Sequence, residues 1–154
     1  MICVIMQTEH LHEIAQLQQQ WAAEQITYGF VAGTPEQIAV DLTPYCYVLK
    51  DAQRVIGYLM AEVRHDNEYC VFPNGASFID VNDLFISKDY RSRGLGKVLL
   101  GRCEADARQN GIQHMLLSSA TKDAEAVRQF YTSNDYTIWT TQFFKNLCPS
   151  PKKG

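Results

Sequence analysis

Residues 84–97 read Leu-Phe-Ile-Ser-Lys-Asp-Tyr-Arg-Ser-Arg-Gly-Leu-Gly-Lys, and this stretch decides the fold. Its apolar start is typical of a strand, and its glycine-rich end opens a helix predicted from Gly94 to Asn110. Gly94 and Gly96 let the backbone approach a ligand, and the first N–H groups of a helix have no partners within it. The sequence therefore predicts an anion-binding turn between a strand and a helix.

Basic side chains surround this turn. Arg91, Arg93 and Lys97 can each add a charge-assisted contact to an anion. Two other phosphate motifs do not fit, because a Walker A loop needs glycine in place of Arg91 and a dinucleotide fingerprint needs glycine in place of Leu99. The residues alone leave open that the glycines only shape a tight turn and that the basic side chains are solvated.

The elements around the turn predict one mixed α/β sheet with helices on its faces. We expect a strand at residues 2–6, a helix capped by Thr8 and a short helix after the cap Thr34. The remaining elements are a hairpin at 45–50 and 55–63, a strand at 76–87, a strand at 114–119, a helix at 123–132 and a last extended stretch at 136–144.

Two motifs resemble a known family. Residues 91–96, Arg-Ser-Arg-Gly-Leu-Gly, match the R/Q-x-x-G-x-G/A signature of the GNAT superfamily of N-acetyltransferases, and residues 83–86 resemble its acidic, splayed fourth strand. Phe130, Tyr131 and Tyr136 resemble its other motif, F-Y-x-x-x-G-F/Y. The resemblance covers nearly the whole chain and implies a GNAT-like acyltransferase fold. Its central twisted sheet would be mostly antiparallel, with splayed strands and helices on both faces.

The resemblance also implies acetyl-coenzyme A as cosubstrate. The backbone of residues 84–86 would pair with the pantetheine arm, and residues 92–97 would hold the pyrophosphate. Ala124 stands where the family often has an asparagine that contacts the coenzyme, and Asp135 replaces a glycine. The latter change is tolerated if Asn134 or Asp135 is left-handed. The implied coenzyme-binding residues are Leu84, Phe85, Ile86, Arg91, Ser92, Arg93, Gly94, Leu95, Gly96, Lys97, Ser119 and Ala124.

Acetyl transfer to an amine requires a proton acceptor for the amine and a proton donor for the departing thiolate. The resemblance makes Tyr131 the donor; otherwise Tyr131 is a core aromatic beside Phe130. Asp80 and Asp83, on the predicted strand, are the candidate bases, and Asn82 cannot serve as one. Either aspartate could instead orient a cationic substrate, and a water chain could replace a single base.

Backbone N–H groups at a strand bulge near Leu84 and Phe85 would polarise the thioester carbonyl. The implied reaction is acetyl transfer from acetyl-coenzyme A to a primary amine of a small molecule or peptide, by direct attack in a ternary complex. The alternative is a non-catalytic sensor or regulatory module that binds acetyl-coenzyme A or coenzyme A, in line with Ala124 and the undecided base.

The sequence does not identify the acceptor. A pocket for a small cationic amine, such as a polyamine or an aminoglycoside, could be lined by aromatic and acidic side chains. The candidates are Tyr28, Phe30, Tyr45, Tyr47 and Tyr69 with Glu24, Asp41, Glu62 and Asp66. The family often forms dimers through its last strands, which makes residues 137–144 a candidate homodimer contact.

The composition is consistent with one domain, residues 1–148, followed by a disordered tail at 149–154. The net charge of −3 argues against a nucleic-acid or anionic-lipid partner. No apolar run approaches the roughly 20 residues that span a bilayer, so we expect a cytoplasmic protein. The five cysteines are widely spaced and read as reduced thiols, and the four histidines indicate no metal site.

Overall fold

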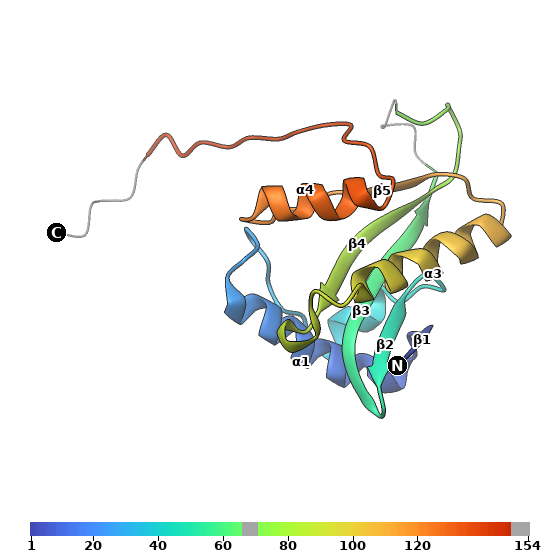
Figure 1. Ribbon diagram of the computed structural model, residues 1–154, viewed down its shortest axis with the longest axis vertical. Coiled ribbons are helices and arrows are strands. Elements are labelled where there is room, and N and C mark those ends of the chain that lie inside the picture. Colours follow the sequence, from blue (N-terminus) through green and yellow to red (C-terminus); the bar gives the residue numbers. More distant parts are fainter. Residues whose placement is uncertain (66–70, 149–154) are drawn as a thin grey trace.

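The computed structural model describes residues 1–65 and 71–148, which form one mixed five-stranded sheet (Figure 1). The strands are β1 (Ile2–Ile5), β2 (Tyr47–Asp51), β3 (Arg54–Arg64), β4 (Phe78–Ile86) and β5 (Met115–Leu117). Neighbours in the sheet follow the order of the sequence. Neighbouring strands from β1 to β4 are antiparallel, and β5 is parallel to β4. The predicted tail at 149–154 lies outside the described residues.

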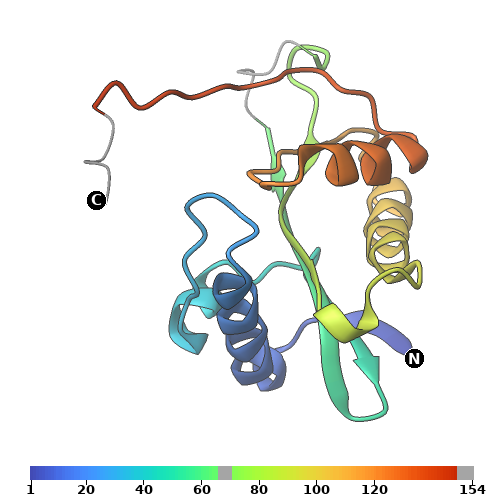
Figure 2. The same cartoon turned by 60° about the vertical axis from the view of Figure 1, so that its left-hand side comes forward.

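Helices cover both faces of the sheet, as Figure 2 shows, and this confirms the predicted fold class. On one face lie α1 (Leu11–Glu24) and α2 (Pro35–Val40), and on the other lie α3 (Leu95–Gln109) and α4 (Ala124–Ser133). Two 3-10 turns, η1 (Thr8–His10) and η2 (Lys88–Tyr90), precede α1 and α3.

The helix starts confirm one predicted cap and correct another. Thr34 Oγ1 accepts a hydrogen bond from the Gln37 backbone at 3.3 Å, and the Gln37 side chain accepts one from the Thr34 backbone at 2.9 Å. Thr8, in contrast, is not the cap of α1 but the first residue of η1. The backbone N–H of Gln7 binds the ring of His10 at 2.9 Å, which closes an extra turn ahead of the helix.

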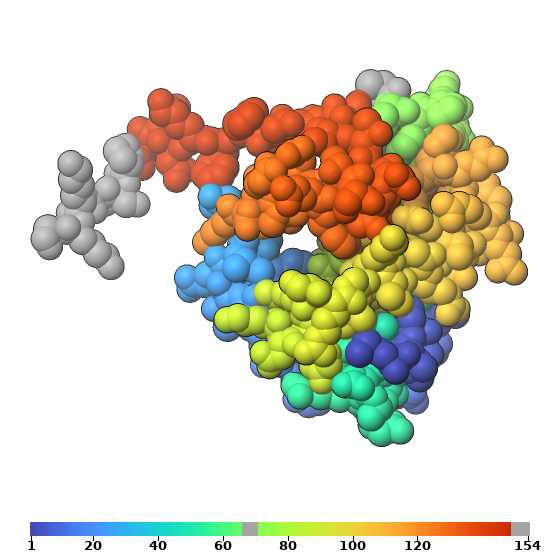
Figure 3. Space-filling model, in the orientation of Figure 1, coloured from blue at the N-terminus to red at the C-terminus, as the bar shows by residue number. Residues whose placement is uncertain are grey.

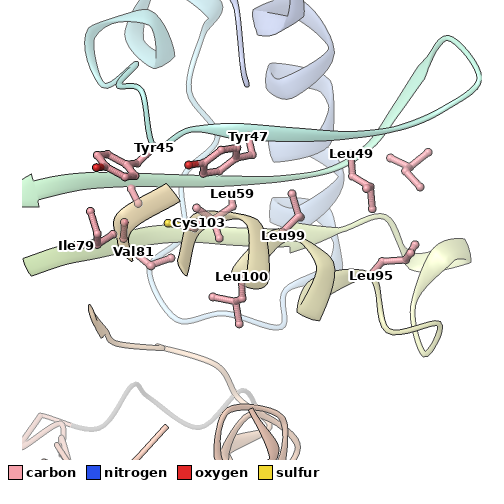
Figure 4. Close-up of a cluster of buried hydrophobic side chains, with 13 residues drawn as sticks. Tyr45, Tyr47, Leu49, Leu59, Ile79, Val81, Leu95, Leu99, Leu100 and Cys103 are labelled. Carbon is pink, nitrogen blue, oxygen red and sulfur yellow. The ribbon is translucent and has the colours of Figure 1, made fainter. Parts of the chain in front are cut away.

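Two buried clusters fill the two sides of the sheet. On the α3 side, Leu99, Leu100 and Cys103 pack against Tyr47 and Leu59 (Figure 4). On the α1 side, apolar residues of α1 pack against β2, β3 and β4. The four described cysteines, Cys3, Cys46, Cys103 and Cys148, are free thiols.

A β-bulge at Asn82 reverses the facing of the residues that follow it in β4. Ala61 pairs with Val81 and Met60 pairs with Asp83, so Asn82 is the extra residue. Val81 lies in the cluster on the α3 side, whereas Phe85 lies in the cluster on the α1 side. Because facing alternates along a strand, an unbulged β4 would keep both on one side. The bulge thus turns Asp83 toward α1.

The sequence predicts a bulge near Leu84 and Phe85, and the structure has one slightly earlier in the strand, at Asn82. A bulge is set by register with the neighbouring strand, which the sequence of β4 alone does not contain. Strand β4 pairs with β5 only through residues 79–81. Residues 82–86 continue along β3, and within the described chain no strand pairs with their other edge. The two strands therefore splay apart beyond Val81.

The extended stretch predicted at 136–144 does not join the sheet. In the structure, residues 136–146 form no strand: Tyr136 packs on the α3-side core, and the chain then runs past α4 as an extended segment whose Phe144 meets the Tyr28 ring edge-on at 5.3 Å (Figure 1). Strand-like side chains are not sufficient, because a strand also needs a hydrogen-bonded neighbour. Phe143, Phe144 and Leu147 are consequently 92, 70 and 84 % exposed.

Candidate active site

The turn before α3 has a backbone suited to an anion. Ser92 and Gly94 both adopt positive φ, 61° and 74°, so the chain curls tightly before the helix begins. Gly94 is the N-cap, and it contributes no side-chain cap to the first N–H groups of α3. These groups and the positive end of the helix dipole remain available to a ligand.

The three basic side chains of the turn differ in direction. Arg91 points inward: its guanidinium binds both carboxylate oxygens of Glu24 at 2.7 and 2.8 Å and the Ile86 carbonyl at 2.9 Å. Arg93 is exposed, lies over the Tyr90 ring and donates to the Asp89 carbonyl at 3.0 Å. Lys97, in the first turn of α3, is also exposed. Arg91 therefore anchors the turn to α1, whereas Arg93 and Lys97 can meet an incoming anion.

Gly96 has a second role that the motif does not reveal. A Cβ atom at this position would lie 3.0 Å from Cζ of Phe130. The Phe130 ring on α4 thus packs directly on the start of α3. The missing side chain at Gly96 therefore lets α4 pack closely on α3, in addition to its role in the turn.

A cavity of about 300 Å³ opens where β4 and β5 separate. Figure 3 shows the molecule hollowed between α4, the turn before α3 and the loop after α1. The predicted residues Asp83, Leu84, Ser119 and Tyr131 all line this cavity. Its other lining residues are Trp21, Thr27, Tyr28, Gly29, Phe30, Val81, Asn82, Leu117, Ser118 and Ala120.

The two candidate bases have different surroundings. Asp83 accepts hydrogen bonds from the Tyr58 hydroxyl at 3.2 Å and from Gln18 at 3.5 Å, both on Oδ2. Burial raises the pKa of Asp83; the Tyr58 hydrogen bond lowers it and the charge of Asp41 raises it further. Asp80 does not line the cavity and forms an ion pair with Arg64 at 3.1 Å.

Tyr131 lines the same cavity as Asp83. Burial raises the pKa of Tyr131 to about 12, so its hydroxyl is protonated at neutral pH. Its ring packs edge-on against Phe130 and Tyr136, with centroids 5.0 and 5.6 Å away. These two contacts fix the Tyr131 ring, and Tyr131 itself borders the cavity.

Aromatic side chains from α1 and from the loop that follows it form the outer wall of the cavity. Trp21 stacks between Phe30, at 4.0 Å, and Phe85, at 5.1 Å, and its indole N–H donates to Thr27 at 2.9 Å. The loop is tied to the segment after β5 by two backbone bonds of 2.8 Å, from Tyr28 to Ala120 and from Lys122 to Ile26. The wall is thus built from segments about a hundred residues apart.

Several acceptor-pocket candidates lie elsewhere. Tyr45 and Tyr47 belong to the core on the α3 side and bind Asn110 and Asp106. Glu24 is paired with Arg91, and Glu62 is exposed on β3. Tyr28 and Phe30 do line the cavity, and Tyr69 and Asp66 lie outside the described residues. Sequence reasoning missed Trp21, Gln18 and Tyr58, whose helical or strand spacing reads simply as core.

Within residues 1–65 and 71–148, no three His, Cys, Asp or Glu side chains gather closely enough to hold a metal ion. None of the helices in the same part of the chain combines the length and apolarity that crossing a membrane requires.

The model of the acetyltransferase (GNAT) family matches residues 8–136, from η1 to the end of the F-Y motif. The chain belongs to this family. The match includes every element of the cavity and of the anion-binding turn. No curated protein sequence matches the chain.

Solved structures share the GNAT fold over almost the whole chain. A tetramutant of the BH1408 protein from Bacillus halodurans superposes with a TM-score of 0.76 at 13 % identity, covering 96 % of this chain and 100 % of that one. Aminoglycoside N-acetyltransferase AAC(6′)-Iy in complex with CoA gives 0.70 at 17 % identity, with 96 and 100 % covered. A predicted acetyltransferase with acetyl-CoA from Clostridium acetobutylicum gives 0.70 at 10 % identity, with 95 and 96 % covered.

The two departures from the GNAT pattern have structural explanations. Asp135 adopts φ 66°, which confirms that a left-handed residue replaces the usual glycine after α4. Ala124 is the first residue of α4 and has no polar side chain to offer. The neighbouring Asp123 instead caps the helix by accepting a hydrogen bond from the Ala126 backbone at 3.1 Å.

Proposed function

We propose that the protein transfers the acetyl group of acetyl-coenzyme A to a primary amine of a small molecule or peptide, by direct attack in a ternary complex. One observation carries the proposal: Asp83 and Tyr131, a candidate proton acceptor and a candidate proton donor, line one cavity at the splay of β4 and β5. Membership of the acetyltransferase (GNAT) family supports the reaction class.

The chain offers complementary sites for the two ends of acetyl-coenzyme A. The unpaired edge of residues 82–86 can hydrogen-bond the amide groups of the pantetheine arm, as a neighbouring strand would. The backbone of residues 92–97, with Arg93 and Lys97, would hold the pyrophosphate. Structural neighbours in complex with CoA or acetyl-CoA support this choice of cosubstrate.

The proton transfers follow from the environments of the two side chains. Asp83 would take the proton that the amine loses as it attacks the thioester carbonyl, because its raised pKa makes it a stronger base than an ordinary aspartate. Tyr131 would give its proton to the departing sulfur and recover one from solvent. The coenzyme supplies the activated acetyl group.

The cavity favours a small cationic acceptor. A volume of about 300 Å³ is at the lower end of the range for small-molecule sites. One face of the Phe30 ring stacks on Trp21, and its other face can attract an ammonium group; the Asp83 carboxylate lines the same cavity. Two structural neighbours are named as aminoglycoside acetyltransferases, which is consistent with a small polyamine-like acceptor.

We further propose a homodimer held by residues 137–147. This segment is strand-like in sequence, pairs with no strand of the described chain and leaves Phe143, Phe144 and Leu147 largely exposed, with Phe144 meeting the body only edge-on at Tyr28. Strand β5 is the edge of the sheet, and no strand of the described chain covers its outer side. Pairing with a second copy would bury both surfaces at once.

The first test is calorimetric titration with acetyl-coenzyme A, coenzyme A and ATP. We expect micromolar binding of the two coenzymes and weaker binding of ATP; no coenzyme binding would overturn the proposal. Thiol release is then followed with putrescine, spermidine, kanamycin and a lysine-containing peptide. Coenzyme binding without turnover on any amine would favour a non-catalytic coenzyme sensor, a role consistent with the missing polar side chain at Ala124.

Asp83→Asn tests the base. It retains the size of the side chain and removes its basicity, so kcat should fall by about a hundredfold or more. Asp80→Asn is the matched control from the same strand, because the Asp80 carboxylate is paired with Arg64 outside the cavity. A normal rate in Asp83→Asn and a slow one in Asp80→Asn would reverse the assignment.

A further inference from the structure

Gln18 connects two parts of the proposed acceptor site. It lies on α1 and is only 6 % exposed. Its Oε1 accepts a hydrogen bond from the Gly33 backbone at 2.8 Å, and its Nε2 donates to Asp83 Oδ2 at 3.5 Å. A buried amide needs partners for both of its ends, so this one side chain holds the loop and the carboxylate together.

The loop at residues 26–33 seats on α1 at two neighbouring points. Trp21 follows Gln18 by one helical turn and stacks on Phe30 at 4.0 Å. At Gly33, an added Cβ would lie 3.3 Å from Gln18 Oε1, so glycine permits the close approach of the loop. The hydrogen bond to Gly33 and the stacked ring therefore fix the loop in the position that forms the outer wall of the cavity.

The other end of Gln18 orients the carboxylate of Asp83. Tyr58, from β3, donates to the same Oδ2 atom at 3.2 Å. Within the described chain, Oδ1 accepts no hydrogen bond, which leaves it as the oxygen that can accept a proton from the acceptor. Besides Tyr58, the ionisable group that shifts the pKa of Asp83 is Asp41, the C-cap residue that follows α2.

We propose that Gln18 is a positioning residue, which fixes the loop at residues 26–33 and the Asp83 carboxylate relative to each other. The loop position that binds the amine is then also the position in which Asp83 can deprotonate it. The inference rests on the proposed role of Asp83. It adds that the loop contributes to catalysis through Gln18, and not only to acceptor binding.

Three substitutions separate the two ends of Gln18. Gln18→Met removes both hydrogen bonds at similar volume, so the acceptor KM should rise about 5- to 10-fold and the acid limb of kcat/KM should move to higher pH. Gln18→Glu keeps an acceptor for Gly33 but adds a carboxyl beside Asp83. Its acceptor KM should stay within about twofold, whereas its acid limb should move further. Tyr58→Phe removes the hydroxyl that contacts Asp83 and Gln18 but leaves the Gln18 hydrogen bond to Gly33 in place, so it should move the acid limb and keep the acceptor KM within about twofold.

These profiles are measured with the best acceptor of the amine panel, and acetyl-coenzyme A affinity and melting temperature are measured for each variant. Carbon-13 titration of the Asp83 carboxyl, assigned with Asp83→Asn, reports the same pKa changes without an acceptor. If Gln18→Met leaves both the acceptor KM and the Asp83 titration unchanged, the inference is overturned. A Gln18 side chain that served only in packing would, when replaced, alter the melting temperature alone. A fully active Asp83→Asn variant would be a separate result. It would overturn the proposed role of Asp83 as the base, independently of the outcome for Gln18→Met.

Discussion

Arg91 and Arg93 stand two residues apart in one motif, but the structure predicts opposite consequences for their loss. Arg91→Ala would remove two bonds to Glu24, one bond to the Ile86 carbonyl and a cation–π contact with Phe85 at 5.2 Å. It would also leave Glu24, whose side chain is 18 % exposed, without its partner. The Arg91 side chain is itself 34 % exposed, which places the pair between the surface and buried cases.

We therefore expect Arg91→Ala to lower the free energy of unfolding by about 2–3 kcal/mol. For a chain of this size, that corresponds to a fall of roughly 5–10 °C in melting temperature. Arg93→Ala should change the melting temperature by less than about 2 °C, because exposed substitutions rarely exceed 0.5 kcal/mol. Its effect should appear in coenzyme binding, which loses a charge-assisted contact and weakens about tenfold.

Thermal unfolding by circular dichroism without coenzyme, and calorimetric titration with acetyl-coenzyme A, measure the two effects separately. Glu24→Gln provides the matched control, since it disrupts the pair while keeping the charge of Arg91. It should lower the melting temperature and leave coenzyme affinity within about threefold. If Arg91→Ala melts like the unmodified protein but loses as much coenzyme affinity as Arg93→Ala, Arg91 faces the coenzyme in solution and the reasoning fails.

Three further predictions concern packing, chemistry and assembly. Gly57→Ala would place Cβ 2.6 Å from Ile86 Cδ1 and 2.9 Å from the Phe85 carbonyl oxygen, and should cost about 2–3 kcal/mol of stability in denaturant unfolding. Gly101→Ala, within α3 and with nothing within 4 Å of the new Cβ, should instead stabilise by about 0.5–1 kcal/mol, and equal effects would refute the packing account. Tyr131→Phe should lower kcat at least tenfold without altering coenzyme affinity; an unaffected rate removes Tyr131 from the mechanism. Deleting residues 137–154 should convert a dimer to a monomer in light scattering, and a monomeric full-length protein would contradict the proposed arm.

The sequence predicted most of the fold because its signals are local. The capping box at Thr34 and the glycine turn before α3 each depend on a few consecutive residues. The last stretch at 136–144 shows the limit of such reasoning. Its side chains favour a strand, but whether a strand forms depends on a partner edge that the local sequence does not specify.

The candidate site also has one part that local sequence predicts and one part that depends on distant residues. The coenzyme side is one continuous motif, and a continuous motif can be recognised residue by residue. The acceptor side is assembled from α1, β3, β4 and the segment after β5, so Gln18 and Tyr58 are separated from Asp83 by 65 and 25 residues. Their link depends on the bulge at Asn82, which turns Asp83 toward α1. Since one extra residue in β4 decides this facing, removing the bulge would send Asp83 to the α3 side and separate it from the acceptor loop while leaving the coenzyme motif unchanged.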